Sequence, residues 1–138
     1  MKKILIIFLL IIICISGFMI GKYYENYKTI DVIGGFKISE VTKISFQYDN
    51  PAIKRQTIED KKEINKFMNY INSYRFRKKP DQIPMVGYYR MVTFYISDKK
   101  VTNIILYDKF IDINGIQYNM TKNKLNLQKI DDFIKSRI

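Results

Sequence analysis

Histidine and tryptophan are absent from this chain of 138 residues, and cysteine occurs only once, as Cys14. Without histidine there is no Ser-His-Asp or Cys-His arrangement, and the commonest general base at neutral pH is missing. Without a second cysteine, the chain after Cys14 forms neither a disulfide nor a zinc–thiolate site. These absences exclude the best-known nucleophilic mechanisms, and any metal site would need clustered carboxylates.

Paired acids and phosphate-binding loops are also scarce. The adjacent acidic pairs are Glu59-Asp60 and Asp131-Asp132. Both lie on or beside the start of a predicted helix, and we interpret them as acids that are solvated or that interact favourably with the helix dipole. Gly34-Gly35 lacks the flanking residues of a phosphate-binding loop. We therefore expect no catalytic residue, no cofactor and no metal. A small carboxylate-based hydrolase is the disfavoured alternative, because two distant acids sometimes meet in a fold.

Charge is absent from one long apolar run, residues 4–20, which follows Lys2 and Lys3. Its length of about 17 residues corresponds to roughly 26 Å of helix, the low end for a membrane span. The two lysines favour a cytoplasmic N-terminus and a body outside the membrane. Residues 1–21 are predicted to be an uncleaved transmembrane anchor, with a cleaved signal peptide as the alternative. Cys14 is predicted to be an apolar residue of the span, because Ile13 is a poor match to a lipoprotein signal.

Positive charge dominates the remaining body. The chain has 24 Lys and Arg, and setting aside Lys2 and Lys3 leaves 22 against 13 Asp and Glu, a net charge near +9. Such a balance favours an acidic partner, such as anionic lipid headgroups, cell-wall polyanions or an acidic protein surface. The abundance of Lys, Ile, Asn, Tyr and Phe also fits the codon usage of an AT-rich genome, which would explain the charge without any selection for binding. An exported domain rarely meets nucleic acid, so we expect no such partner.

Local patterns divide the body into a juxtamembrane linker, residues 22–38, and one extracytoplasmic domain, residues 39–138. Alternation predicts strands over Val41–Tyr48 and Ile53–Ile58. Asp60 is a predicted helix N-cap. The helix that follows has an apolar stripe and runs to about Ser73; the stripe consists of Ile64, Phe67, Met68 and Ile71.

The second half of the domain reads as a β-meander followed by a helix. Strands are predicted over Tyr74–Lys79, Val86–Ile96 and Val101–Tyr107, and Asn114-Gly115 predicts a tight hairpin between two further short strands. Asn126 is the predicted cap of a last helix. We therefore predict an α+β fold preceded by an N-terminal hydrophobic helix. It has an antiparallel sheet of about five to seven strands, two helices on one face, and the order β-β-α-β-β-β-β-α.

The body resembles a family of small exported or membrane-anchored proteins of low-GC Gram-positive bacteria that are described only as domains of unknown function. The resemblance covers residues 41–138. It implies the same fold and no catalytic residues, because its motifs are structural; it departs from the family pattern at Tyr88, where members often have Trp after the strand glycine. The stretches that carry it are Val41-Thr42-Lys43-Ile44, Ile58-Glu59-Asp60-Lys61-Lys62-Glu63-Ile64, Tyr70-Ile71-Asn72-Ser73-Tyr74-Arg75-Phe76, Gly87-Tyr88-Tyr89, and Ile111-Asp112-Ile113-Asn114-Gly115 with Tyr118.

Two groups of side chains are candidates for binding. Arg75, Arg77 and Lys79, with Lys78 beside them, alternate along a predicted strand and place three cations on one face. Such a row suits phosphates or an acidic protein, and equally suits a solvated edge that resists strand pairing. The second group is aromatic: alternation places Tyr88 and Phe94 on one face, and Tyr89 and Tyr95 on the other. Tyr89 and Tyr95 are the candidate interface residues.

These features favour a membrane-tethered extracytoplasmic interaction module without catalytic activity. It would bind another protein through the open sheet face, in an immunity, inhibitor or accessory role. The alternative is a basic envelope protein that binds wall polymers or lipid headgroups through Arg75–Lys79. The partner's identity, the oligomeric state and the fate of the leader do not follow from the residues.

Overall fold

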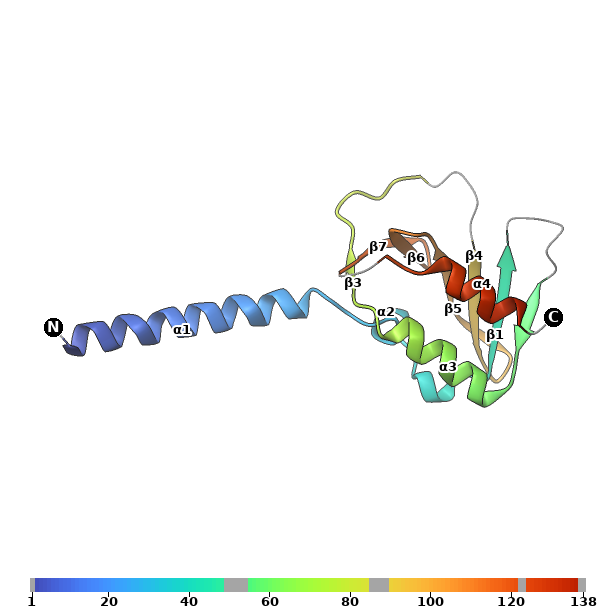
Figure 1. Ribbon diagram of the computed structural model, residues 1–138, viewed down its shortest axis with the longest axis horizontal. Helices are drawn as coiled ribbons and strands as arrows, with labels where there is room; N and C mark the ends of the chain where they lie inside the picture. The colour runs from blue at the N-terminus through green and yellow to red at the C-terminus, as the bar shows by residue number, and fades with distance from the viewer. Residues whose placement is uncertain (1, 49–54, 85–89, 122–123, 137–138) are drawn as a thin grey trace.

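The computed structural model describes residues 2–48, 55–84, 90–121 and 124–136. It has an α+β fold in which an antiparallel sheet of seven strands is preceded by a long apolar helix (Figure 1). The class is as predicted, and seven strands lie within the predicted five to seven, one more than the predicted order β-β-α-β-β-β-β-α contains. The helices are α1 (Lys2–Glu25), α2 (Ile30–Gly34), α3 (Lys61–Asn72) and α4 (Leu127–Lys135), with a 3-10 turn η1 (Ile38–Glu40).

The sheet runs in the order β2-β1-β4-β5-β6-β7-β3. Strands β4 to β7 form a meander, and β1 and β3 flank it on either side. In the predicted Asn114-Gly115 hairpin both residues have positive φ, 52° and 87°, as a tight two-residue turn requires. The strands are β1 (Lys43–Tyr48), β2 (Gln56–Ile58), β3 (Phe76–Lys78), β4 (Arg90–Ile96), β5 (Lys99–Leu106), β6 (Phe110–Ile113) and β7 (Ile116–Met120).

Helix α3 packs on one face of the sheet as its apolar stripe predicts. The Asp60 carboxylate accepts a hydrogen bond from the Glu63 backbone N–H, 2.9 Å, which confirms the predicted N-cap. All four stripe residues are buried, and burial of each contributes about 1.5–3 kcal/mol. The Phe67 ring meets Phe46 of β1 edge-on at 5.0 Å. Helix α4, capped by Asn126 as predicted, lies on the same side of the sheet, with Phe133 5.6 Å from Phe67.

The chain between α1 and β1 is packed against the domain over much of its length. Lys28 and Phe76 form an isolated antiparallel bridge, with N···O distances of 2.9 and 2.8 Å. Ile30 is fully buried and Phe36 nearly so, and the Thr102 hydroxyl donates a hydrogen bond to the Gly34 carbonyl. Residues 28–36, which the sequence assigns to a linker, therefore contribute to the core.

Helix α1 extends away from the domain (Figure 1). Its segment Lys3–Tyr23 is apolar and long enough to cross a membrane, and all of its side chains are exposed in the isolated chain. The helix is therefore a candidate membrane anchor or signal sequence.

Candidate functional site

The sheet face opposite α3 and α4 is the main candidate surface, because no described helix covers it. Alternation along β4 and β5 directs Val92, Phe94 and Ile104 into the core, and Met91, Tyr95 and Ile105 to the other side. Met91 and Ile105 are direct cross-strand partners. Tyr107 stacks on Phe110 at 4.6 Å. We call these half-buried residues the open-face patch; they are Met91, Tyr95, Ile105, Tyr107 and Phe110.

A row of short polar side chains crosses the centre of this face. The Thr93 hydroxyl donates a hydrogen bond to the side-chain oxygen Oδ1 of Asn103, 2.9 Å, and the side-chain Nδ2 of Asn103 contacts the Met91 sulfur at 3.2 Å. Ser45, the β1 partner of Thr93, is buried, and its hydroxyl has no hydrogen-bond partner among the described residues. These contacts fix the Asn103 side chain. The polar row therefore keeps one arrangement between Tyr95 and the Met91–Ile105 pair.

Lys43 is the principal cation beside Tyr95. Its ammonium lies 5.2 Å from the Tyr95 ring centroid and makes ion pairs with Asp98 and Glu59. The hydrogen bond from Lys43 to Asp98 outweighs desolvation and raises the pKa of Lys43. The charge of Lys43 is therefore largely balanced within the protein, and Tyr95 is the part of this cluster best suited to contact a partner.

The described residues include only part of the predicted aromatic group. Phe94 lies in the core and Tyr95 on the open face, as alternation predicts. Tyr88 and Tyr89 lie outside the described residues. Sequence reasoning did not single out Ile105, Tyr107 or Phe110, although period-2 spacing places Ile105 and Tyr107 on the same face.

The four predicted cations do not form one uniform row. Strand β3 directs Lys78 to the same side as buried Phe76, and Arg77 to the opposite side. The Lys79 ammonium lies over Phe110 at 4.6 Å, at the margin of the open-face patch. The Arg75 guanidinium turns back to the carbonyls of Asn72 and Tyr74, 3.1 and 3.4 Å, near the end of α3. Arg77 and Lys79 thus border the open face, whereas Arg75 and Lys78 point elsewhere.

Arg77 also connects the domain to the end of α1. Its guanidinium lies 5.9 Å from the Tyr27 ring centroid, and the Tyr27 ring lies 4.9 Å from that of Tyr23. A hydrogen bond from Tyr23, followed by interactions with Arg77, lowers the pKa of Tyr27. These three side chains form a contact between the last turn of α1 and strand β3.

An ion pair between β4 and α4 was not predicted. Arg90 binds Asp131 with two hydrogen bonds of 2.7 Å, and the Tyr48 hydroxyl donates to the same carboxylate at 3.2 Å. The side chains of Arg90 and Asp131 are only 20% and 14% exposed. The interpretation of Asp131 as a solvated or dipole-favoured acid at a helix start is therefore wrong: it is the fifth residue of α4 and anchors that helix to the sheet.

The segment after β3 folds onto the open face at β7. The Gln82 side chain accepts a hydrogen bond from the Gln117 N–H, 2.7 Å, and donates to its carbonyl, 3.3 Å. The Gln117 side chain donates to the Ile83 carbonyl, 2.6 Å, and accepts from its N–H, 3.1 Å. This exchange buries Gln117 and closes one side of the open face.

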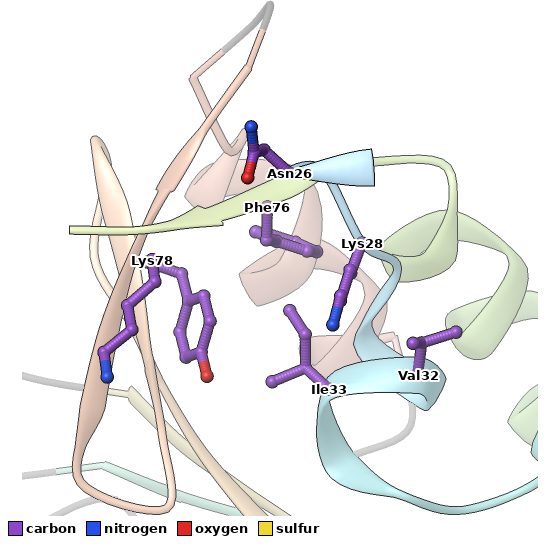
Figure 2. A pocket seen from close by; sticks show the side chains of 7 residues that line it. Asn26, Lys28, Val32, Ile33, Phe76 and Lys78 are labelled. Carbon is purple, nitrogen blue, oxygen red and sulfur yellow. The ribbon is translucent and has the colours of Figure 1, made fainter. Parts of the chain in front are cut away.

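A second candidate site is a pocket of about 370 Å³ on the side of the sheet that faces α2 (Figure 2). Lys28 and Lys78 extend from adjoining backbone segments toward the same side, with Ile33 of α2 near Lys28. Neither ammonium makes an ion pair with any described residue. The lining residues are Asn26, Lys28, Val32, Ile33, Phe76, Lys78 and Tyr118.

Acidic side chains do not gather anywhere in the part of the chain that the structure describes. No group of three or more His, Cys, Asp or Glu in those ranges is placed to hold a metal ion. Of the two acidic pairs, Asp60 caps α3, Glu59 approaches Lys43, Asp131 binds Arg90 and Asp132 accepts from Gln128.

Comparison with known proteins gives no relatives. No family model matches the chain, and neither a curated protein nor a solved structure is significantly similar to it. The resemblance to a family of exported domains therefore stays a prediction.

Proposed function

We propose that this protein is a membrane-tethered extracytoplasmic module that binds another protein through the open face of its sheet, in an immunity, inhibitor or accessory role and without catalysis. The observation that carries the proposal is the open-face patch: five half-buried apolar and aromatic side chains lie on a sheet face that no described helix covers. Apolar groups that share one sheet face at this exposure are typical of the centre of a protein interface.

Charge at the border of the patch indicates what the partner presents. Lys79 and Arg77 border it on the β3 side, and Arg55, which donates a hydrogen bond to Gln47, lies on the β1 side. Lys43, by contrast, is balanced by Asp98 and Glu59. A partner with an apolar centre and acidic side chains at its rim would complement this surface and be steered toward it.

The membrane tether follows from α1. Its apolar segment fits a span, and Lys2 and Lys3 favour a cytoplasmic N-terminus, so the domain would lie outside the membrane. A tether restricts the domain to a thin layer above the bilayer, which raises its effective concentration toward other envelope proteins.

Photo-crosslinking in intact cells tests the interface. The full-length chain would be expressed in a Gram-positive host with a benzophenone side chain at Ile105 or, as the control, at exposed Asn65 on the outer side of α3. We expect one discrete protein adduct from Ile105 that is absent with the Asn65 probe. Equal adducts from both positions, or none from either, would overturn the proposal.

The alternative is binding of polyanionic wall polymers through the cations of residues 75–79. The observation that favours it is that Arg77 and Lys79 lie together at the edge of the sheet. Polyanion binding weakens steeply with ionic strength. Charge reversal by Arg77→Glu would therefore abolish the salt-sensitive association with wall material, whereas the Ile105 adduct would still form, only more slowly, because a rim charge mainly steers association.

A further inference from the structure

The pocket between α2, β3 and β7 lies close to the membrane if α1 is the anchor. The apolar segment ends at Tyr23, and Lys28 follows five residues later, so the two are separated by at most roughly 17 Å of extended chain. The headgroup layer on each side of a bilayer is about 5–7 Å thick, so Lys28 lies within that layer or at most about 12 Å beyond it. The Lys28–Phe76 bridge then fixes the β3 edge at the same height. In Figure 1, β3 and α2 also lie at the end of the domain nearest α1.

The chemistry of the pocket suits an anion with an apolar attachment. Lys28 and Lys78 supply two ammonium groups without ion-pair partners among the described residues. Tyr118 lines the pocket, and its hydroxyl, which is protonated at neutral pH, is a hydrogen-bond donor; burial, and to a smaller extent the charge of Asp112, raises the pKa of Tyr118 further. Val32 is 59% exposed and lies beside Ile33, which gives the pocket an apolar rim.

We propose that this pocket binds the phosphate of an anionic phospholipid headgroup in the leaflet from which α1 emerges. The lysines would contact the phosphate, Tyr118 would donate a hydrogen bond to it, and Val32 would contact the glycerol and upper acyl region. Bound lipid would hold the β3 edge toward the membrane and so orient the domain. The inference rests on the proposed membrane tether and is independent of the protein interface.

Lipid retention in nanodiscs tests the proposal. The full-length chain would be inserted into nanodiscs of phosphatidylcholine containing about one third phosphatidylglycerol, and retained lipid would be counted by native mass spectrometry. The test variant carries Lys28→Gln and Lys78→Gln. The matched control carries Lys62→Gln and Lys99→Gln, which remove the same charge from exposed positions on α3 and at the start of β5.

We expect wild type and the control to retain one phosphatidylglycerol in preference to phosphatidylcholine. The test variant should bind it roughly 30-fold more weakly, since each lysine near an anionic surface contributes about 1 kcal/mol. Equal retention by both variants would overturn the proposal, and so would displacement of the lipid by inorganic phosphate at the same concentration, which would identify a soluble anion as the ligand. A chain that inserts but shows no lipid preference refutes the pocket alone. A chain that does not insert refutes the tether as well.

Discussion

Gln82 and Gln117 lie 35 residues apart, and the Gln82 side-chain amide makes two hydrogen bonds with the Gln117 backbone. The Gln117 side-chain amide in turn makes two with the backbone of Ile83, the residue after Gln82. The Lys79 N–H donates to the Gln117 carbonyl, which is the last ladder bond between β3 and β7. The Gln82 amide then occupies the place that a further strand residue would take. This exchange positions the segment after β3 against one side of the open face.

Removing either amide should loosen this segment without unfolding the domain. Gln117→Ala leaves the Ile83 N–H and C=O without their partners. Gln82→Ala leaves the Gln117 N–H without its acceptor, while the Gln117 carbonyl keeps its hydrogen bond from the Lys79 N–H. Each substitution should lower the free energy of unfolding by about 1–2 kcal/mol. Denaturant unfolding of the full-length chain in detergent provides the measurement. The double variant should lose less free energy of unfolding than the two single variants lose together, and the difference should be about 0.5 kcal/mol or more. Gln128→Ala, which removes an exposed hydrogen bond to Asp132, is the control.

Asp131 should make stability depend on pH in the acid range. Burial alone would raise the pKa of Asp131, but the hydrogen bonds and charge of Arg90 together with Tyr48 leave that pKa below its ordinary value. A carboxyl whose folded pKa is depressed stabilises the protein above its unfolded pKa, about 3.9, and loses that contribution as pH falls through the folded pKa.

Asp131→Asn should therefore lower the free energy of unfolding by about 1.5–3 kcal/mol at neutral pH, because Arg90 loses a charged acceptor. The loss should shrink as pH falls below about 4, since the wild-type carboxyl then takes up a proton too. Unfolding curves recorded from neutral pH into the acid range measure both effects. Asp132→Asn, at an exposed neighbouring position, should not change how the free energy of unfolding depends on pH in the acid range. If the free energies of unfolding of wild type and Asp131→Asn change with pH in parallel, the role given to Arg90 is refuted.

Gly34 tests whether residues 28–36 belong to the folded domain. A Cβ at this position would lie 2.6 and 2.8 Å from atoms of the Phe36 ring and 2.8 Å from the Thr102 hydroxyl. Gly34→Ala should therefore destabilise the domain by about 1–3 kcal/mol through overpacking. Gly17→Ala in α1, where nothing lies within 4 Å of the added Cβ, should leave the unfolding of the domain unchanged. If Gly34→Ala also leaves the unfolding of the domain unchanged, residues 28–36 are a free linker.

The N-cap of α3 should have a measurable effect of its own. Asp60→Ala removes the acceptor for the Glu63 N–H and should cost about 1 kcal/mol. A loss of that size lowers the melting temperature of a domain of this length by about 4 °C. Asp60→Asn keeps a side-chain oxygen and should recover most of the loss, whereas an equal decrease in both variants would mean that charge rather than the hydrogen bond matters.

Local patterns predicted the parts of the fold that depend on neighbouring residues. The α3 stripe and the Asn114-Gly115 turn are local signals, and the structure bears both out. The contacts that shape the candidate sites join distant segments: Arg90 and Asp131 are 41 residues apart. Helix α2 has only five residues, too short to show a period, so the burial of Ile30 had no signal in the sequence. Alternation predicted correctly that Arg77 and Lys79 share a face, but not that Arg75 turns back to the end of α3, and the contacts of Arg77 and Lys79 depended on where Tyr27 and Phe110 lie.

Cysteine labelling in intact cells can show whether the domain lies outside the membrane with its open face occupied by a partner. In a Cys14→Ser background, which has no other cysteine, single Ile105→Cys and Asn65→Cys variants would be treated with a membrane-impermeant maleimide, in cells and after purification. We expect the Asn65 position to react equally fast in both settings, and the Ile105 position to react at least about tenfold more slowly in cells than when purified. Such a ratio corresponds to a face that is occupied about nine-tenths of the time. Equal rates at the Ile105 position in cells and in the purified protein would contradict the interface, and reaction at either position only after lysis would contradict the external domain.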